Sequence, residues 1–136
     1  MTLSEDDIKV INDMITNAIA PITTRLDIIE DELYNEINII KALLHNSMCS
    51  SSENLVKVPL KNGALPLNEY PQTISLLAVP HQSNSVTAEK ALALIREYEP
   101  DYTDDESDQV LTRKRRVRLA KLLGISATQL NFAQFF

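Results

Sequence analysis

Few residues in this 136-residue chain have the types and spacing that catalysis or metal binding requires. The two histidines, His45 and His81, lie in different segments, and neither has a serine, cysteine or carboxylate partner at a motif spacing. His45 and Cys49 are one helical turn apart and could supply two ligands per chain to a metal shared between chains, but two ligands are a weak signal. We therefore expect both side chains to face solvent at a helix end. The sequence predicts a protein that is not an enzyme, with no metal site and no cofactor.

Two runs of carboxylates, Glu30-Asp31-Glu32 and Asp104-Asp105-Glu106, contain neighbouring acids of the kind that acid–base catalysis uses. The first run falls within an apolar pattern of helical period, so we expect it to form a solvated helix face. The second run follows Thr103, and a threonine with a glutamate three residues later is the pattern of a capping box. Both runs are therefore predicted to be structural and not catalytic.

Six basic residues within nine positions form the strongest charge feature of the chain. They are Arg113, Lys114, Arg115, Arg116, Arg118 and Lys121. One interpretation is a nuclear import signal or a stripe that contacts phosphates. The other is electrostatic, because acids at the start of a helix and bases towards its end complement the helix dipole and one another. The chain has a formal charge of −6, so any contact with nucleic acid would have to come from this basic run.

The element expected to organise the molecule is a helix over residues 5–47 that carries an apolar stripe. Apolar residues recur there at alternating steps of three and four, which is the heptad pattern of a coiled coil. Ser4, followed by three acidic residues, is the expected helix start. The residues predicted to mediate oligomerisation, at the a and d positions, are Ile8, Ile15, Ile19, Ile22, Leu26, Ile29, Leu33, Ile40 and Leu43.

One such helix cannot bury its stripe alone, so we expect the chain to associate with copies of itself. Isoleucine at d with leucine at a favours more than two strands, whereas Asn12 at an a position is typical of a register-fixing residue in dimers. A tetramer is favoured, with a dimer next. Pro21 is predicted to kink the helix or to break it into an intrachain hairpin of residues 5–19 and 21–46. A buried helix of a monomeric globule is the remaining alternative.

The middle of the chain combines a linker with a candidate strand. Residues 48–54 are rich in serine and are predicted to be the linker. β-Branched and basic residues then alternate before Asn62-Gly63, which predicts an extended or hairpin segment over 55–68, placed on a sheet edge because Pro59 cannot donate to a ladder. The residues predicted to bind a partner protein by strand addition are Val56, Lys57, Val58, Leu60 and Lys61. This alternation resembles the peptides that dock on the extra-terminal domains of bromodomain proteins. A strand packed on its own C-terminal module is the other interpretation.

Three helices are predicted in the C-terminal module of residues 55–136, at about 86–98, 104–123 and 127–135. Before them, Thr73 is expected to cap a short helical turn. Gly124 is predicted to end the second of the three helices as its C′ residue, and Ser126 with Gln129 form a capping box for the third.

The segment 117–136 resembles a helix-turn-helix, which implies that 127–135 is a recognition helix. That helix holds no arginine or lysine, and only Gln129, Asn131 and Gln134 have side chains suited to reading bases. A plain packed helical hairpin is therefore the alternative interpretation of this segment.

The order of motifs along the chain resembles a group of fungal proteins known chiefly as meiotically upregulated. The resemblance rests on a coiled coil followed by Pro-Leu-Lys-Asn-Gly-Ala-Leu-Pro at 59–66, Tyr-Pro-Gln-Thr at 70–73 and Arg-Arg-Val-Arg-Leu-Ala at 115–120. It implies a fungal cell and a meiotic setting but no activity. Some lineage-restricted fungal genes of this sort are selfish spore killers, so a toxin that acts through assembly is one alternative function.

These patterns predict a mainly α-helical chain with an N-terminal oligomeric coiled coil and a small C-terminal helical module that includes a short β-hairpin-like segment. The function they favour is a non-enzymatic scaffold or adaptor that binds another protein through several copies of that module. A nuclear DNA- or chromatin-associated factor is the second function. The start of the chain lacks a secretory signal, and no segment is apolar for the roughly 18 residues of a spanning helix. We therefore expect no membrane contact and a location in the nucleus or the cytoplasm, with the nucleus slightly favoured.

Overall fold

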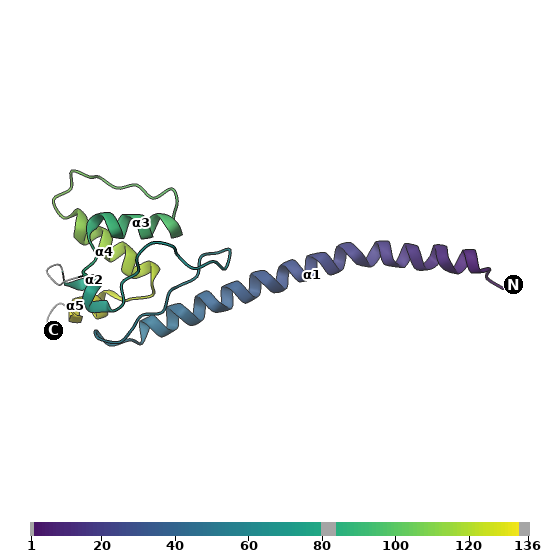
Figure 1. Ribbon diagram of the computed structural model, residues 1–136, viewed down its shortest axis with the longest axis horizontal. Helices are drawn as coiled ribbons and strands as arrows, with labels where there is room; N and C mark the ends of the chain where they lie inside the picture. Colours follow the sequence, from purple (N-terminus) through teal and green to yellow (C-terminus); the bar gives the residue numbers. More distant parts are fainter. Residues whose placement is uncertain (1, 80–83, 134–136) are drawn as a thin grey trace. The chain divides into compact units, whose positions relative to one another are not determined.

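A computed structural model describes residues 2–79 and 84–133 of the chain, and this part is mainly helical (Figure 1). Five helices occur in it: α1 (Glu5–Ser47), α2 (Ile74–Ala78), α3 (Ala88–Tyr98), α4 (Leu111–Leu122) and α5 (Ala127–Ala133). The chain divides into two compact units with a boundary between Tyr34 and Asn35. Most of α1 therefore belongs to the first unit, and its last turns belong to the second.

Helix α1 begins where the sequence predicts it. The N–H of Ser4 donates to the Asp7 carboxylate at 3.2 Å, and the N–H of Asp7 donates to the Ser4 hydroxyl at 3.1 Å. This reciprocal cap satisfies two backbone donors that a helix start leaves without partners. The helix then continues through Pro21 as far as Ser47, so the alternative of two helices folded back as a hairpin is wrong.

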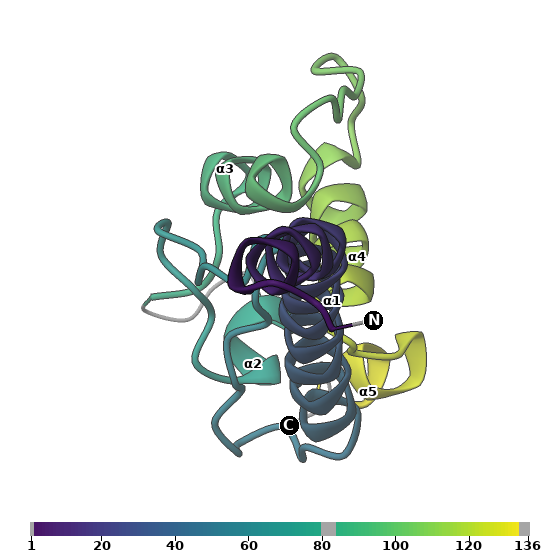
Figure 2. The same cartoon turned by 90° about the vertical axis from the view of Figure 1, so that its right-hand side faces the viewer.

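The core of the second unit is built from aliphatic side chains of all the helices. Helix α3 packs along α4 (Figures 1 and 2), and α2 packs against α5 (Figure 1). The largest fully buried apolar side chains are Ile74, Leu77, Leu94, Ile95, Leu119 and Leu123. Burying such a side chain stabilises the fold by about 2 kcal/mol. The last turns of α1 contribute Ala42 to the same core.

The corner between α4 and α5 has the two caps that the sequence predicts. Gly124 has a φ of +82°, its N–H donates to Lys121 at 3.2 Å, and the next N–H, of Ile125, donates to Ala120 at 2.8 Å. This pair of bonds is the Schellman motif that ends a helix. Ser126 and Gln129 then exchange reciprocal bonds of 2.9 and 3.1 Å at the start of α5, which confirms the predicted capping box.

The other helix starts depend on threonine caps. The hydroxyl of Thr73 accepts from the N–H of Leu76 at 3.3 Å, as expected for the cap of α2. The hydroxyl of Thr87 accepts from Lys90 at 3.2 Å, which places the first residue of α3 at Ala88, two residues later than predicted.

Helix α4 begins at Leu111 and not near Asp104, so the predicted capping box after Thr103 does not form a helix start. The carboxylates of that segment have other partners. Asp104 accepts two hydrogen bonds from the Arg115 guanidinium at 2.7 and 3.0 Å, and Asp105 accepts from Ser107. Because charge-assisted bonds of this kind are stronger than a cap bond, residues 101–110 form a loop that reaches back to α4.

The predicted β-hairpin is not supported, because no strand occurs among the described residues. The Asn-Gly turn itself does form: the N–H of Gly63 donates to Leu60 at 2.9 Å, the N–H of Leu60 donates to Ala64 at 2.8 Å, and Gly63 has a φ of +86°. The backbone ahead of that turn is bonded by side chains instead of a second strand. Two prolines, Pro59 and Pro66, remove N–H groups from both arms, which explains why a ladder does not form.

Candidate functional site

One face of α1 exposes a long row of apolar side chains. Every described residue of the first unit, from Thr2 to Tyr34, is exposed within a single chain. Ile22 and Leu26, at the middle of the predicted seam, are each 58% exposed. Eight of the nine predicted oligomerisation residues are exposed in this way, and we call them the α1 apolar face: Ile8, Ile15, Ile19, Ile22, Leu26, Ile29, Leu33 and Ile40.

The ninth predicted residue, Leu43, lies elsewhere. It is half-buried and packs against the core of the second unit. A Cβ atom added at Gly124 would come within 2.6 Å of the Leu43 carbonyl oxygen, so the two backbones are in close contact. Leu43 therefore contributes to the chain's own core, and the apolar face ends before it.

The polar centre of the second unit is the side chain of Asn46, which is fully buried. Its Nδ2 donates to the carbonyl oxygens of Val56 at 2.9 Å and Leu123 at 2.8 Å, and its Oδ1 accepts from the N–H of Val56 at 2.8 Å. Gln129 adds two further bonds, from Nε2 to the carbonyl oxygens of Asn46 and Cys49 at 3.0 and 3.1 Å. Sequence reasoning missed this centre, because an asparagine near a helix end has no pattern that predicts burial.

Two tyrosines complete the bonding of the candidate partner-binding strand. The hydroxyl of Tyr70 accepts from the N–H of Val58 at 3.1 Å and donates to the carbonyl of Val56 at 3.2 Å. The hydroxyl of Tyr98 donates to the carbonyl of Val58 at 2.6 Å. Burial raises the pKa of both phenols, and the neighbouring Tyr70 raises that of Tyr98 further, so both remain protonated donors.

The five residues predicted to add a strand to a partner differ in exposure. Val58 is buried and Leu60 is half-buried, whereas Val56, Lys57 and Lys61 are exposed. The backbone groups of Val56 and Val58 already bond to side chains of the same unit. Strand addition along that side of the segment would require these bonds to break.

The basic run is largely engaged within the second unit. Arg115 is buried against Asp104, Arg118 pairs with Glu99, and Lys114 pairs with Asp108. Arg116 is buried and donates twice to the Val86 carbonyl, at 3.1 and 2.6 Å. Arg113 and Lys121 remain exposed and, within the described residues, form no ion pair. Most of the predicted phosphate-contacting charge is therefore committed to holding α4 in place.

One of the three side chains expected to read bases, that of Gln129, is bonded within the protein. The side-chain amide of Gln129 is bonded to Asn46 and Cys49, as described above, so it does not point freely from α5. Asn131 is exposed, and Gln134 lies outside the described residues.

The pair His45 and Cys49 differs in part from expectation. His45 is exposed, but Cys49 is buried and its thiol donates to the His45 carbonyl at 3.3 Å. Burial, with the nearby Glu53 carboxylate, raises the pKa of this thiol, which disfavours the thiolate that metals bind. No group of three or more possible ligands occurs in the described part of the chain, and His81 lies outside it.

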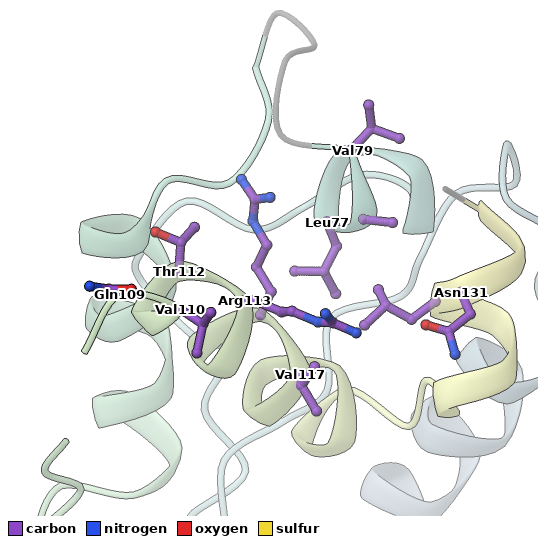
Figure 3. A pocket seen from close by; sticks show the side chains of 11 residues that line it. Leu77, Val79, Gln109, Val110, Thr112, Arg113, Val117 and Asn131 are labelled. Atoms are coloured by element: carbon purple, nitrogen blue, oxygen red, sulfur yellow. The ribbon is translucent and has the colours of Figure 1, made fainter. Parts of the chain in front are cut away.

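A hollow of about 530 Å³ lies on the second unit between α2, α4 and α5, and we call it the α4 pocket. Figure 3 shows lining side chains from all three elements, with Leu77 and Val79 from the α2 end, Thr112, Arg113 and Val117 from α4, and Asn131 from α5. Its wall is completed by Ala78, Gln109, Val110, Arg116 and Leu130. The wall is thus mainly apolar with two guanidinium groups.

Comparisons with known proteins give no family. No protein-family model, curated protein or solved structure matches this chain. Among the described residues, none of the helices is long and apolar enough to cross a membrane.

Proposed function

We propose that this protein is a non-enzymatic scaffold that assembles through the α1 apolar face and presents its second unit in several copies. The observation that carries this proposal is the exposure of the face: residues such as Ile22 and Leu26 have about half of their surface in water in a single chain. Single chains rarely leave so continuous an apolar surface uncovered.

The energetics favour association. Burying the exposed half of an isoleucine or leucine side chain contributes about 1 kcal/mol, and each chain brings eight such side chains to the seam. Association of two or more chains costs roughly 4–15 kcal/mol in lost freedom of motion. The seam of even two chains is large enough to exceed most of that range.

The residues at the seam set the preferred number of chains. Isoleucine dominates the d positions and leucine is frequent at a, which favours a tetramer, while Asn12 keeps a dimer as the next choice. Presenting several second units on one assembly increases their apparent affinity for a partner that has several binding sites, without any new contact.

A DNA-associated function is less favoured. Arg115, Arg116 and Arg118 bond within the second unit, and Gln129 bonds to α1 and the residues after it. Using these side chains on DNA would first require the unit to lose bonds that hold it together.

The mass of the protein in solution tests the proposal. Sedimentation equilibrium of the full chain should give two or four times the single-chain mass, whereas a fragment of residues 35–136 should give its single-chain mass. The fragment begins at Asn35 because Ala42 and Asn46 belong to the core of the second unit. A full chain that stays at 15.3 kDa at every concentration would exclude assembly.

A further inference from the structure

The α4 pocket has an electrostatic imbalance. Arg113 and Arg116 line it, and none of the described residues that line it is an aspartate or glutamate. Its volume of about 530 Å³ is within the usual range for binding sites, roughly 300–1,000 Å³. A site with this lining attracts anions and repels cations.

Arg116 is the pocket residue that most favours an anionic ligand. Its residue is only 9% exposed, and both of its hydrogen bonds go to one neutral acceptor, the carbonyl of Val86. Within the described residues Arg116 forms no ion pair, whereas Arg115, which is also buried, pairs with Asp104. A buried charge without a counter-ion is costly, and a carboxylate in the pocket would remove that cost.

The start of α4 adds backbone donors beside these guanidinium groups, and the Asp108 carboxylate already accepts one of them, the N–H of Val110, at 3.0 Å. Val110 occupies the cap position of this 12-residue helix, and no side chain there accepts a bond from the first turn. Gln109, Val110, Thr112 and Arg113 of this helix start all line the pocket. A bound carboxylate could therefore accept backbone N–H bonds and face the positive end of the helix dipole.

Apart from Asn131, the rest of the wall is apolar, and it is partly open. Leu77 and Leu130 are buried at its base, while Val110 is 49% exposed and Val117 is 37% exposed. Sites for small molecules enclose most of the ligand surface. A hollow with exposed walls covers one side of its occupant, which suits a peptide chain that lies across it.

We propose that the α4 pocket binds an acidic peptide segment of a partner protein, with an aspartate or glutamate next to a large aliphatic or aromatic side chain. The carboxylate faces Arg113, Arg116 and the start of α4, and the apolar side chain enters between Leu77, Val117 and Leu130. This assignment rests on the proposed scaffold function, because it supplies the partner that the repeated units would hold.

Selection from a library of random seven-residue peptides on phage tests the assignment with the full chain. Recovered peptides should be enriched in acids beside leucine, isoleucine or phenylalanine, and synthetic copies should bind more weakly as salt increases. Arg113→Gln and Val117→Asp should each weaken binding at least tenfold. Both positions are exposed, so these variants should fold. Matched controls are Lys121→Gln on the same helix and Thr128→Asp on α5, which lie outside the pocket.

Three results would overturn the assignment: no enriched peptide, enriched peptides without acids, or equal binding to the Val117→Asp variant. Binding of small organic acids with no peptide recovered would also overturn it. Assembly is a separate readout, because a variant with Ile22→Lys and Ile29→Lys should keep the per-chain affinity for the peptide while its mass falls. The two readouts are thus independent: peptide binding can be absent while the protein assembles, and assembly can be absent while the peptide binds.

Discussion

The side-chain amide of Asn46 donates a hydrogen bond of 2.8 Å to the backbone carbonyl of Leu123, 77 positions further along the chain. The same amide group exchanges two bonds with the backbone of Val56. One buried side chain thus joins the end of α1, the extended segment and the end of α4. The last turns of α1 are consequently part of the second unit's structure.

Replacing Asn46 with alanine should destabilise the second unit by about 3 kcal/mol, because it leaves the N–H of Val56 and the buried carbonyl of Leu123 without partners. Urea unfolding followed by circular dichroism measures this change. Ser47→Ala, at the exposed neighbouring position, should change the stability by less than about 0.5 kcal/mol. Equal effects at the two positions would show that the Asn46 bonds are unimportant.

Gly124→Ala should destabilise the chain by about 3 kcal/mol, since a Cβ there meets the Leu43 backbone at 2.6 Å and the φ of +82° strains an alanine. Gly63→Ala is the matched comparison. Its φ is similar, +86°, but the nearest atom at 2.6 Å is the Oδ1 of Asn35, the end of a side chain that can rotate away. We expect a loss of about 1 kcal/mol there. Thermal unfolding of both variants shows which one loses more stability. A larger loss of stability for Gly63→Ala would contradict the close contact between Gly124 and the Leu43 backbone of α1.

Acid should weaken the loop between α3 and α4. Hydrogen bonds from Arg115 hold the pKa of the Asp104 carboxyl below its ordinary value. A carboxyl with a lowered folded-state pKa contributes stability above about pH 4 and loses it as the pH falls through the folded value. Asp104→Asn should cost about 2 kcal/mol at pH 7 and less at pH 3.

Urea midpoints at the two pH values measure the difference for Asp104→Asn. Asp101→Asn, an exposed acid in the same loop, is the control and should show no such pH-dependent difference. A loss that is the same at pH 7 and pH 3 would mean that the pair with Arg115 contributes little.

Pro21→Ala should stabilise α1, because a proline inside a helix costs about 3 kcal/mol relative to alanine. Pro21 lies at a c position of the heptad, away from the proposed seam, so the replacement leaves the seam residues unchanged. The melting temperature of the helix, measured by circular dichroism at fixed protein concentration, should increase. A decrease would show that assembly depends on the distortion that proline introduces.

Local signals account for what the sequence predicts well. The apolar period with Ser4 predicts the bounds of α1, and Gly124 with Ser126 predicts the corner between α4 and α5, because each depends on residues within one or two turns. The α1 apolar face is also predicted from a local signal, the heptad pattern. The face is exposed because no other described segment of the chain covers it.

Long-range partners account for the rest. The predicted start of α4 was wrong because Asp104 bonds to Arg115, eleven residues away. The predicted hairpin does not form because the side chains of Asn46, Tyr70 and Tyr98 bond to the backbone where a strand was expected. The α4 pocket gathers residues from three helices that no spacing in the sequence connects. Such sites become visible only once the fold brings their parts together.

The mass of a variant with Ile22→Lys and Ile29→Lys tests self-assembly most directly. Both residues lie on the α1 apolar face, and burying two lysines in the seam would be costly. The control carries Asn17→Lys and Thr24→Lys, which add the same charge at f positions on the opposite side of the helix. Light scattering should show the Ile22 and Ile29 variant at single-chain mass while wild type and control remain multimers. An unchanged mass for all three proteins would contradict the proposal that α1 assembles the scaffold.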